Sequence, residues 1–262
     1  MKKLLMLLSV LFVCTVAFAH TINWHVEDQI ISTTTCNSGD AITPPTVPTK
    51  YGYHPKVWGP SQYIKLEYIE STGTQYIDTG YVPTNATRLD IKYKVTQLPS
   101  DLRSGAVPIG ARVAWQDRMF GIFSPVNQQN TNMLMEANVA LTFSFNPLNK
   151  EIIATIDIPN NYRAFDVEGT VYSSNASYAK VTYVYPLYMF QQNLAGIVST
   201  SDAHIRIYYV QIKENNVLVR NFIPARRITD KAIGMYDTVT QTFFENQGAG
   251  TFIAGPAVGY IQ

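Results

Sequence analysis

Apolar and polar residues alternate along much of the chain after residue 60. In residues 89–95 every second residue is apolar and the others are charged. Residues 152–158 follow the same pattern more loosely, and residues 205–212 change phase near Tyr208 and Tyr209. A period of two is typical of strands with one face in water, and a change of phase indicates a β-bulge or burial on both faces. Helical periodicity is hard to find, so the pattern predicts an all-β protein.

Turn residues divide these apolar runs into short segments. Residues 214–216 (Glu-Asn-Asn) and residues 246–250 (Asn-Gln-Gly-Ala-Gly) each predict a hairpin between two apolar runs. Many short strands with frequent turns favour a sandwich or a barrel. Residues 43–60 hold five prolines, a density that favours a rigid connector, and we place a domain boundary at the end of this stretch.

The first 19 residues have the pattern of a secretory signal peptide. Lys2 and Lys3 precede an apolar run that ends in Ala17-Phe18-Ala19, a small-x-small cleavage pattern. Cleavage near Ala19 predicts a secreted or cell-surface protein. The apolar run is shorter than the roughly 20 residues that span a bilayer, so no membrane insertion is expected.

Composition narrows the possible partners. The formal net charge is +1, which argues against nucleic acid as a partner because such binders carry a basic excess. Cys36 is the only cysteine after the signal peptide, so no internal disulfide is expected. Stability must come from the apolar core.

One family resemblance covers nearly all of residues 63–256. The segment 63–80 (YIKLEYIESTGTQYIDTG) resembles the start of laminin-G-like, concanavalin A-like domains, and segments 186–190, 219–227 and 234–237 fit the same family. The resemblance implies a jelly-roll β-sandwich of two antiparallel sheets over residues 60–262. Many members of this family bind carbohydrate or protein ligands, and some related branches are glycosidases.

A second resemblance concerns residues 20–59. Segments 39–45 and 48–53, followed by Trp58, resemble the internalin-B-type repeat, a small β-grasp module of secreted surface proteins. Pro55 and Val57 depart from its pattern. We expect Trp24 and Trp58 to pack in a core.

Catalytic motifs are hard to find. Glycosidases of this fold need facing carboxylates, but Glu67 and Glu70 are three residues apart and point to opposite faces of a strand, while Asp157 is expected on a wet face. No Gly-x-Ser-x-Gly elbow occurs. Whether the protein is an enzyme is left open, and the balance favours a non-catalytic role.

Metal sites have little support in the sequence. Cleavage after Ala19 would make His20 the N-terminus, and lytic polysaccharide monooxygenases bind copper through such a histidine, but nothing else of that family is visible. Calcium accompanies many laminin-G-like domains and is not excluded, although no cluster of aspartates would hold it. No cofactor is expected.

Two loops are candidates for ligand binding. The first is a polar hairpin tip carrying an exposed aromatic ring, formed by Trp115, Gln116, Asp117 and Arg118. The second contributes amide groups from Gln191 and Asn193. Aromatic rings stack on sugar rings and amides bind hydroxyls, although a solvated turn is the simpler explanation of each loop.

These observations favour a secreted recognition module that binds a glycan or a cell-surface protein. The alternatives are a structural or adhesive part of a surface or phage-like assembly and, third, a glycoside hydrolase.

Overall fold

The computed structural model describes residues 19–26, 29–37, 39–43, 62–101, 105–124, 130–199 and 201–261. The chain divides into two compact units. The first unit comprises Met1–Lys65, Arg227–Lys231 and Val258–Gln262, and the second comprises Leu66–Arg226 and Ala232–Ala257. Residues 1–18 of the expected signal peptide, the proline-rich connector from residue 44 on, Trp58 and the Trp24 side chain lie outside this description.

In the first unit a hairpin joins β1 (His20–Val26) to β2 (Gln29–Cys36), antiparallel and with a register shift between Trp24 and His25. Two further strands, β3 (Tyr63–Leu66) and β22 (Ala257–Ile261), pair with each other. The β-grasp architecture suggested for residues 20–59 stays a prediction, because most of the residues after the hairpin lie outside the described ones.

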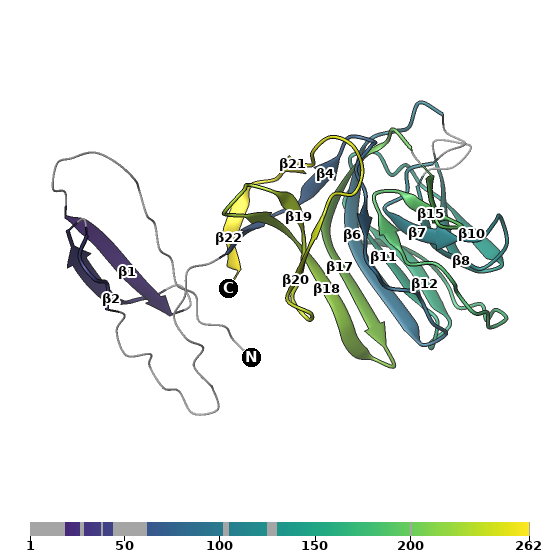
Figure 1. Cartoon of the computed structure of the whole chain (residues 1–262). Coiled ribbons are helices and arrows are strands. Elements are labelled where there is room, and N and C mark those ends of the chain that lie inside the picture. Colours follow the sequence, from purple (N-terminus) through teal and green to yellow (C-terminus); the bar gives the residue numbers. More distant parts are fainter. Residues whose placement is uncertain are drawn as a thin grey trace. The chain divides into compact units, whose positions relative to one another are not determined.

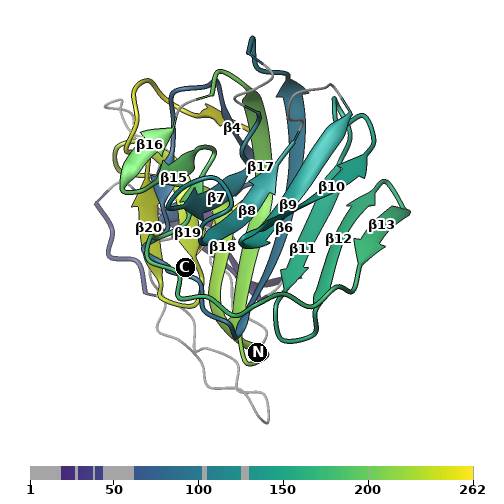
Figure 2. The same cartoon turned by 90° about the vertical axis from the view of Figure 1, so that its right-hand side faces the viewer.

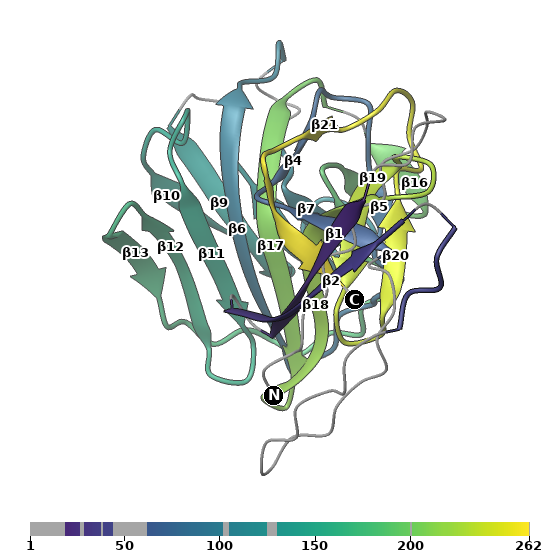
Figure 3. The same cartoon turned by 90° about the vertical axis from the view of Figure 1, so that its left-hand side faces the viewer.

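The second unit is a sandwich of two sheets (Figure 1). The strands of the larger sheet are, in spatial order, β13 (Thr170–Ser174), β12 (Tyr162–Val167), β11 (Ile152–Asp157), β6 (Thr87–Gln97), β17 (His204–Glu214), β18 (Val217–Arg227), β19 (Ile233–Asp237) and β20 (Thr242–Glu245). Figure 3 shows this sheet from its outer side. Two short strands extend it beside β17, namely β4 (Ile69–Ser71) and β21 (Ile253–Ala254).

The smaller sheet lies in front in Figure 2. Its strands are, in order, β10 (Val139–Ser144), β9 (Thr131–Ala137), β8 (Met119–Phe123), β7 (Ile109–Arg112), β14 (Tyr188–Met189) and β5 (Ile77–Asp78). β15 (Gln192–Leu194) pairs in parallel with β7, and β16 (Ile197–Ser199) pairs with β15. The other pairings in both sheets are antiparallel. The predicted all-β sandwich is therefore confirmed.

The apolar core lies between the two sheets and follows from strand alternation. In β6 the residues Leu89, Ile91 and Tyr93 are fully buried, and the charged residues between them lie on the outer face. The smaller sheet contributes, among others, Phe120 and Ile122. Burying each such side chain contributes about 1.5–3 kcal/mol.

One ion pair joins the two sheets inside this core. Arg163 on β12 is 1% exposed, and its Nε donates to Oε2 of Glu136 on β9 at 2.6 Å. Its Nη1 donates to the Ala176 carbonyl oxygen at 2.6 Å, and the Tyr178 ring lies against the guanidinium. Burial raises the pKa of Glu136, while the guanidinium opposes that shift.

The predicted bulge and the two predicted hairpins had different outcomes. The register of β17 against β6 shifts between Ile207 and Tyr209, so the predicted bulge is confirmed, and the β17–β18 hairpin turns at Asn215 and Asn216, both with positive φ. The hairpin predicted around residues 246–250 is wrong, because β20 pairs with β19 whereas β21 pairs with β4. This loop instead packs on residues 74–76, where the Tyr76 amide donates to the Asn246 side-chain oxygen at 3.1 Å.

Candidate ligand-binding site

The first candidate loop forms the tip of the β7–β8 hairpin. The tip closes through the main chain, where the Asp117 amide donates to the Ala114 oxygen at 3.2 Å. Gln116 and Arg118 both have positive φ, of 57° and 47°. Left-handed backbone is uncommon for residues other than glycine, and such strain is concentrated at functional sites. The sequence prediction of a polar hairpin tip is confirmed as a local structure.

Trp115 is the exposed aromatic residue of this tip. Its relative exposure is 52%. The guanidinium carbon of Arg112 lies 5.6 Å from the centroid of its ring. A cation over an aromatic ring is attracted by about 0.5–2 kcal/mol, depending on solvation. The indole ring is therefore exposed to solvent and is also held in place by the Arg112 guanidinium.

The other two charged residues of the tip neutralise each other. Nε and Nη2 of Arg118 donate to Oδ1 and Oδ2 of Asp117 at 2.9 and 3.0 Å. This bidentate contact lowers the pKa of the Asp117 carboxyl. The Arg118 amide also donates to the Asn138 side chain in the turn between β9 and β10 at 3.1 Å. The pair therefore shapes the tip and leaves Arg112 as its unpaired cation.

Arg112 extends across the outer face of the smaller sheet. Gly110 on β7 pairs with Gly121 on β8. Arg112 follows Gly110 by two residues, so Arg112 lies on the same face of the sheet as the two glycines. Along the paired strands, Arg112 and Phe123 lie on opposite sides of this glycine pair. The guanidinium carbon of Arg112 nevertheless lies 5.6 Å from the centroid of the Phe123 ring. The arginine side chain therefore extends back toward Phe123, past two glycines that carry no side chains of their own.

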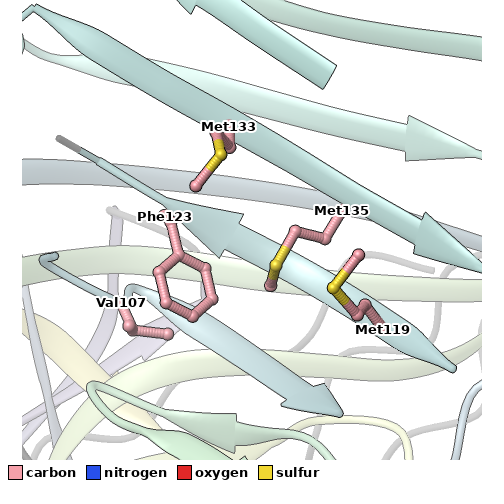
Figure 4. Packing of buried hydrophobic residues seen from close by; sticks show 5 residues of the cluster. All are labelled: Val107, Met119, Phe123, Met133 and Met135. Atoms are coloured by element: carbon pink, nitrogen blue, oxygen red, sulfur yellow. The ribbon is translucent and has the colours of Figure 1, made fainter. Parts of the chain in front are cut away.

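Beneath this arginine lies a cluster that is rich in methionine. Figure 4 shows its members, which are Val107, Met119, Phe123, Met133 and Met135. All are buried, and the Gln116 amide of the hairpin tip contacts the Met119 sulfur at 3.2 Å. Methionine is flexible and polarizable, so such a layer adapts to what packs on it.

Gln192 adds an unusual polar group to the same face. It pairs with Gly110, and its neighbour Leu194 pairs with Arg112, which puts Gln192 and Arg112 on one side of the sheet. Gln192 is 1% exposed, and neither its amide nitrogen nor its amide oxygen has a hydrogen-bond partner in the described part of the chain. A buried polar atom without a partner costs about 1–3 kcal/mol.

We therefore expect Gln192→Leu to raise the free energy of unfolding by about 1–3 kcal/mol, since leucine has a similar size and needs no partner. Urea denaturation of the two proteins measures the difference. As a control, Gln191→Leu should lower stability, because the Gln191 amide has partners. A loss of stability in Gln192→Leu would show that its amide is satisfied.

The second candidate loop requires a correction. Gln191 and Asn193 are buried rather than exposed. The Gln191 amide donates to the oxygens of Gly73 and Ser201 at 2.8 and 2.9 Å, and it accepts from the Ser201 amide at 2.7 Å. Asn193 donates to the Pro186 oxygen at 3.0 Å and accepts from the Gly196 amide. These amides hold loops together through hydrogen bonds to backbone groups. Because those hydrogen bonds leave the amides unavailable to a ligand, we do not include Gln191 and Asn193 in the ligand site.

The acidic residues considered for catalysis have structural surroundings. Asp157 is buried, not on a wet surface as expected, and accepts from Arg88 at 3.1 Å and from Asn160. Glu70 is buried beside Arg206, whose Nε donates to it at 2.7 Å, while Glu67 is exposed. No group of three or more metal-binding side chains occurs among the described residues. No helix in this part of the chain is long and apolar enough to cross a membrane.

Comparisons with known proteins give only distant structural likenesses. No family model matches the sequence, and no characterised protein matches it closely enough to count as a relative. One similar solved structure is alginate lyase A1-II′, a member of polysaccharide lyase family 7, at 15% sequence identity and a TM-score of 0.28. The match covers 50% of this chain and 63%, less than two thirds, of the lyase.

Proposed function

We propose that this protein is a secreted, non-catalytic recognition module that binds a saccharide at the β7–β8 hairpin. The observation that carries the proposal is the Trp115 ring, exposed at a strained tip and supported by Arg112. A fixed aromatic face stacks on the apolar face of a sugar ring with little loss of side-chain entropy. The polar groups of Gln116, Asp117 and Arg118 surround it and can bind hydroxyls.

In this proposal the segment before residue 60 has a separate role. The signal peptide is removed near Ala19, residues 20–59 form the internalin-type unit, and the sandwich presents the binding hairpin outside the cell. The resemblance of segment 63–80 to laminin-G-like domains supports a recognition role.

The test is a glycan array probed with the chain from His20 onward and with its Trp115→Ala variant. We expect selective binding of one saccharide class by the parent chain. In the variant the affinity should fall at least tenfold, which corresponds to about 1.4 kcal/mol of lost stacking. Trp115→Phe should keep part of the affinity, since a smaller ring still stacks.

Val171→Ala provides a matched control, because Val171 is also exposed but lies on the edge strand β13, in the larger sheet. It should bind as the parent does. Full binding by Trp115→Ala would place the site elsewhere. If no glycan is bound, the saccharide reading is wrong, and a surface protein becomes the partner to test.

A further inference from the structure

The guanidinium of Arg112, beside the hairpin tip, indicates which chemical class of saccharide the site can bind. Among the described residues of the second unit, five arginines contact a carboxylate; they are Arg88, Arg118, Arg163, Arg206 and Arg220. Arg112 contacts no carboxylate of the described residues, and none of them offers a hydrogen-bond acceptor to its buried Nε. Arg226 also has a buried Nε without a partner, but no aromatic ring is found against it in the described residues.

The surroundings of Arg112 make an added anion favourable. The side chain is half-buried between the rings of Trp115 and Phe123, and burial lowers its pKa because no carboxylate compensates for the lost water. Aromatic rings attract the charge but do not satisfy the N–H groups of the guanidinium. A carboxylate in the plane of the guanidinium would accept two of these hydrogen bonds at once.

The number of cations at the site distinguishes a carboxylate from a highly sulfated chain. Arg118 is already paired with Asp117, so Arg112 alone is available, and the whole chain carries a formal charge of only +1. Binding a densely charged polyanion requires several cations together. One guanidinium fits one carboxylate.

We propose that the saccharide bound at the β7–β8 hairpin carries a carboxylate, and that Arg112 binds this group while Trp115 stacks on the sugar ring. This inference rests on the proposed function and adds the chemical class of the ligand. It also assigns a role to Arg112, which the sequence did not single out.

The experiment compares acidic oligosaccharides with their neutral methyl esters. The probes are oligomers of glucuronate and galacturonate and a sialic acid trisaccharide, each measured by calorimetry beside its methyl ester, which keeps the sugar and removes the charge. We expect one acidic probe to bind at least tenfold more tightly than its ester. Its affinity should fall as sodium chloride is raised, and the affinity of the ester should not.

The variants then locate the charge. Arg112→Met should abolish the preference for the acid, and Arg112→Lys should retain part of it, because lysine keeps the charge without the bidentate geometry. Trp115→Ala should weaken acid and ester alike. Arg226→Met removes an equal charge elsewhere and should leave the preference unchanged. Thermal melts confirm that each variant is folded, and Arg112→Gln replaces Arg112→Met if that variant is not.

Each failure has a different meaning. If an ester binds as tightly as its acid, or if Arg112→Met keeps the preference, the carboxylate inference is overturned and saccharide recognition stands. If neutral glycans bind on the array but no acidic probe binds, the carboxylate inference is likewise overturned and saccharide recognition stands. If neither acidic nor neutral saccharides bind, both proposals are overturned.

Discussion

Arg163→Met is expected to lower the free energy of unfolding by about 3–5 kcal/mol at pH 7, because it leaves the buried Glu136 carboxylate without its cation. The Arg163–Glu136 ion pair joins the two sheets, so the substitution weakens the contact between them. Urea denaturation followed by circular dichroism measures it. The double variant Arg163→Met with Glu136→Leu should recover most of the loss, since no charge then stays buried.

The same variant should respond to pH with a defined sign. Burial already raises the pKa of Glu136 above its unfolded value, and removal of the guanidinium raises it further. A carboxyl whose pKa is raised by folding costs the folded state no stability below its unfolded pKa, where it is protonated in both states. The folded state loses stability as the pH rises through the folded pKa of the carboxyl. Arg163→Met should therefore be closer to the parent at pH 5 than at pH 7.5. A double variant no more stable than the single one would show that packing, not charge, is responsible.

Gly121→Ala is expected to lower the free energy of unfolding by about 3 kcal/mol or more and to disturb the β7–β8 hairpin. The backbone at Gly121 has a φ of 145°, and an added Cβ would lie 2.4 Å from the Ile109 oxygen and 2.5 Å from the Gly110 Cα. Both are main-chain atoms of the neighbouring strand, so no rotamer change relieves the clash. The clash would displace β7, the strand that carries Arg112, so binding at the hairpin should fall as well.

Gly169→Ala separates the clash from the backbone preference. Gly169 also has a positive φ, of 91°, but nothing lies within 4 Å of an added Cβ. It should lose only about 1 kcal/mol. Denaturation curves of both variants give the comparison. Equal losses would mean that the strand pairing of β7 and β8 adjusts to the extra methyl group.

Strand alternation predicted the sandwich because β6 and β17 each keep one face in water, which makes the period of two visible in the sequence. Strand β8 is buried on both faces, so its apolar run indicates burial but not which side chains face the ligand site. The loop at residues 246–250 has hairpin residues but connects strands that pair with different partners. Turn residues define where a chain bends and not which strands meet.

The candidate site was predictable only in part. Trp115 in a polar tip is a local signal, and it is exposed as expected. Arg112 was missed, because its lack of a carboxylate partner depends on residues far away in the sequence. For the same reason Gln191 and Asn193 appeared available in the sequence, whereas partners such as Gly73 and Ser201 use their amides in the fold.

The bulge in β17 also determines where this strand tolerates a change of length. Ile205 and Ile207 face the core before it, and Val210 and Ile212 face the core after it. Deleting Tyr208 would restore a plain alternation with all four residues still directed inward, whereas an insertion or deletion elsewhere between Ile205 and Ile212 would turn part of the strand over. We therefore expect this strand to tolerate a change of length only at the bulge.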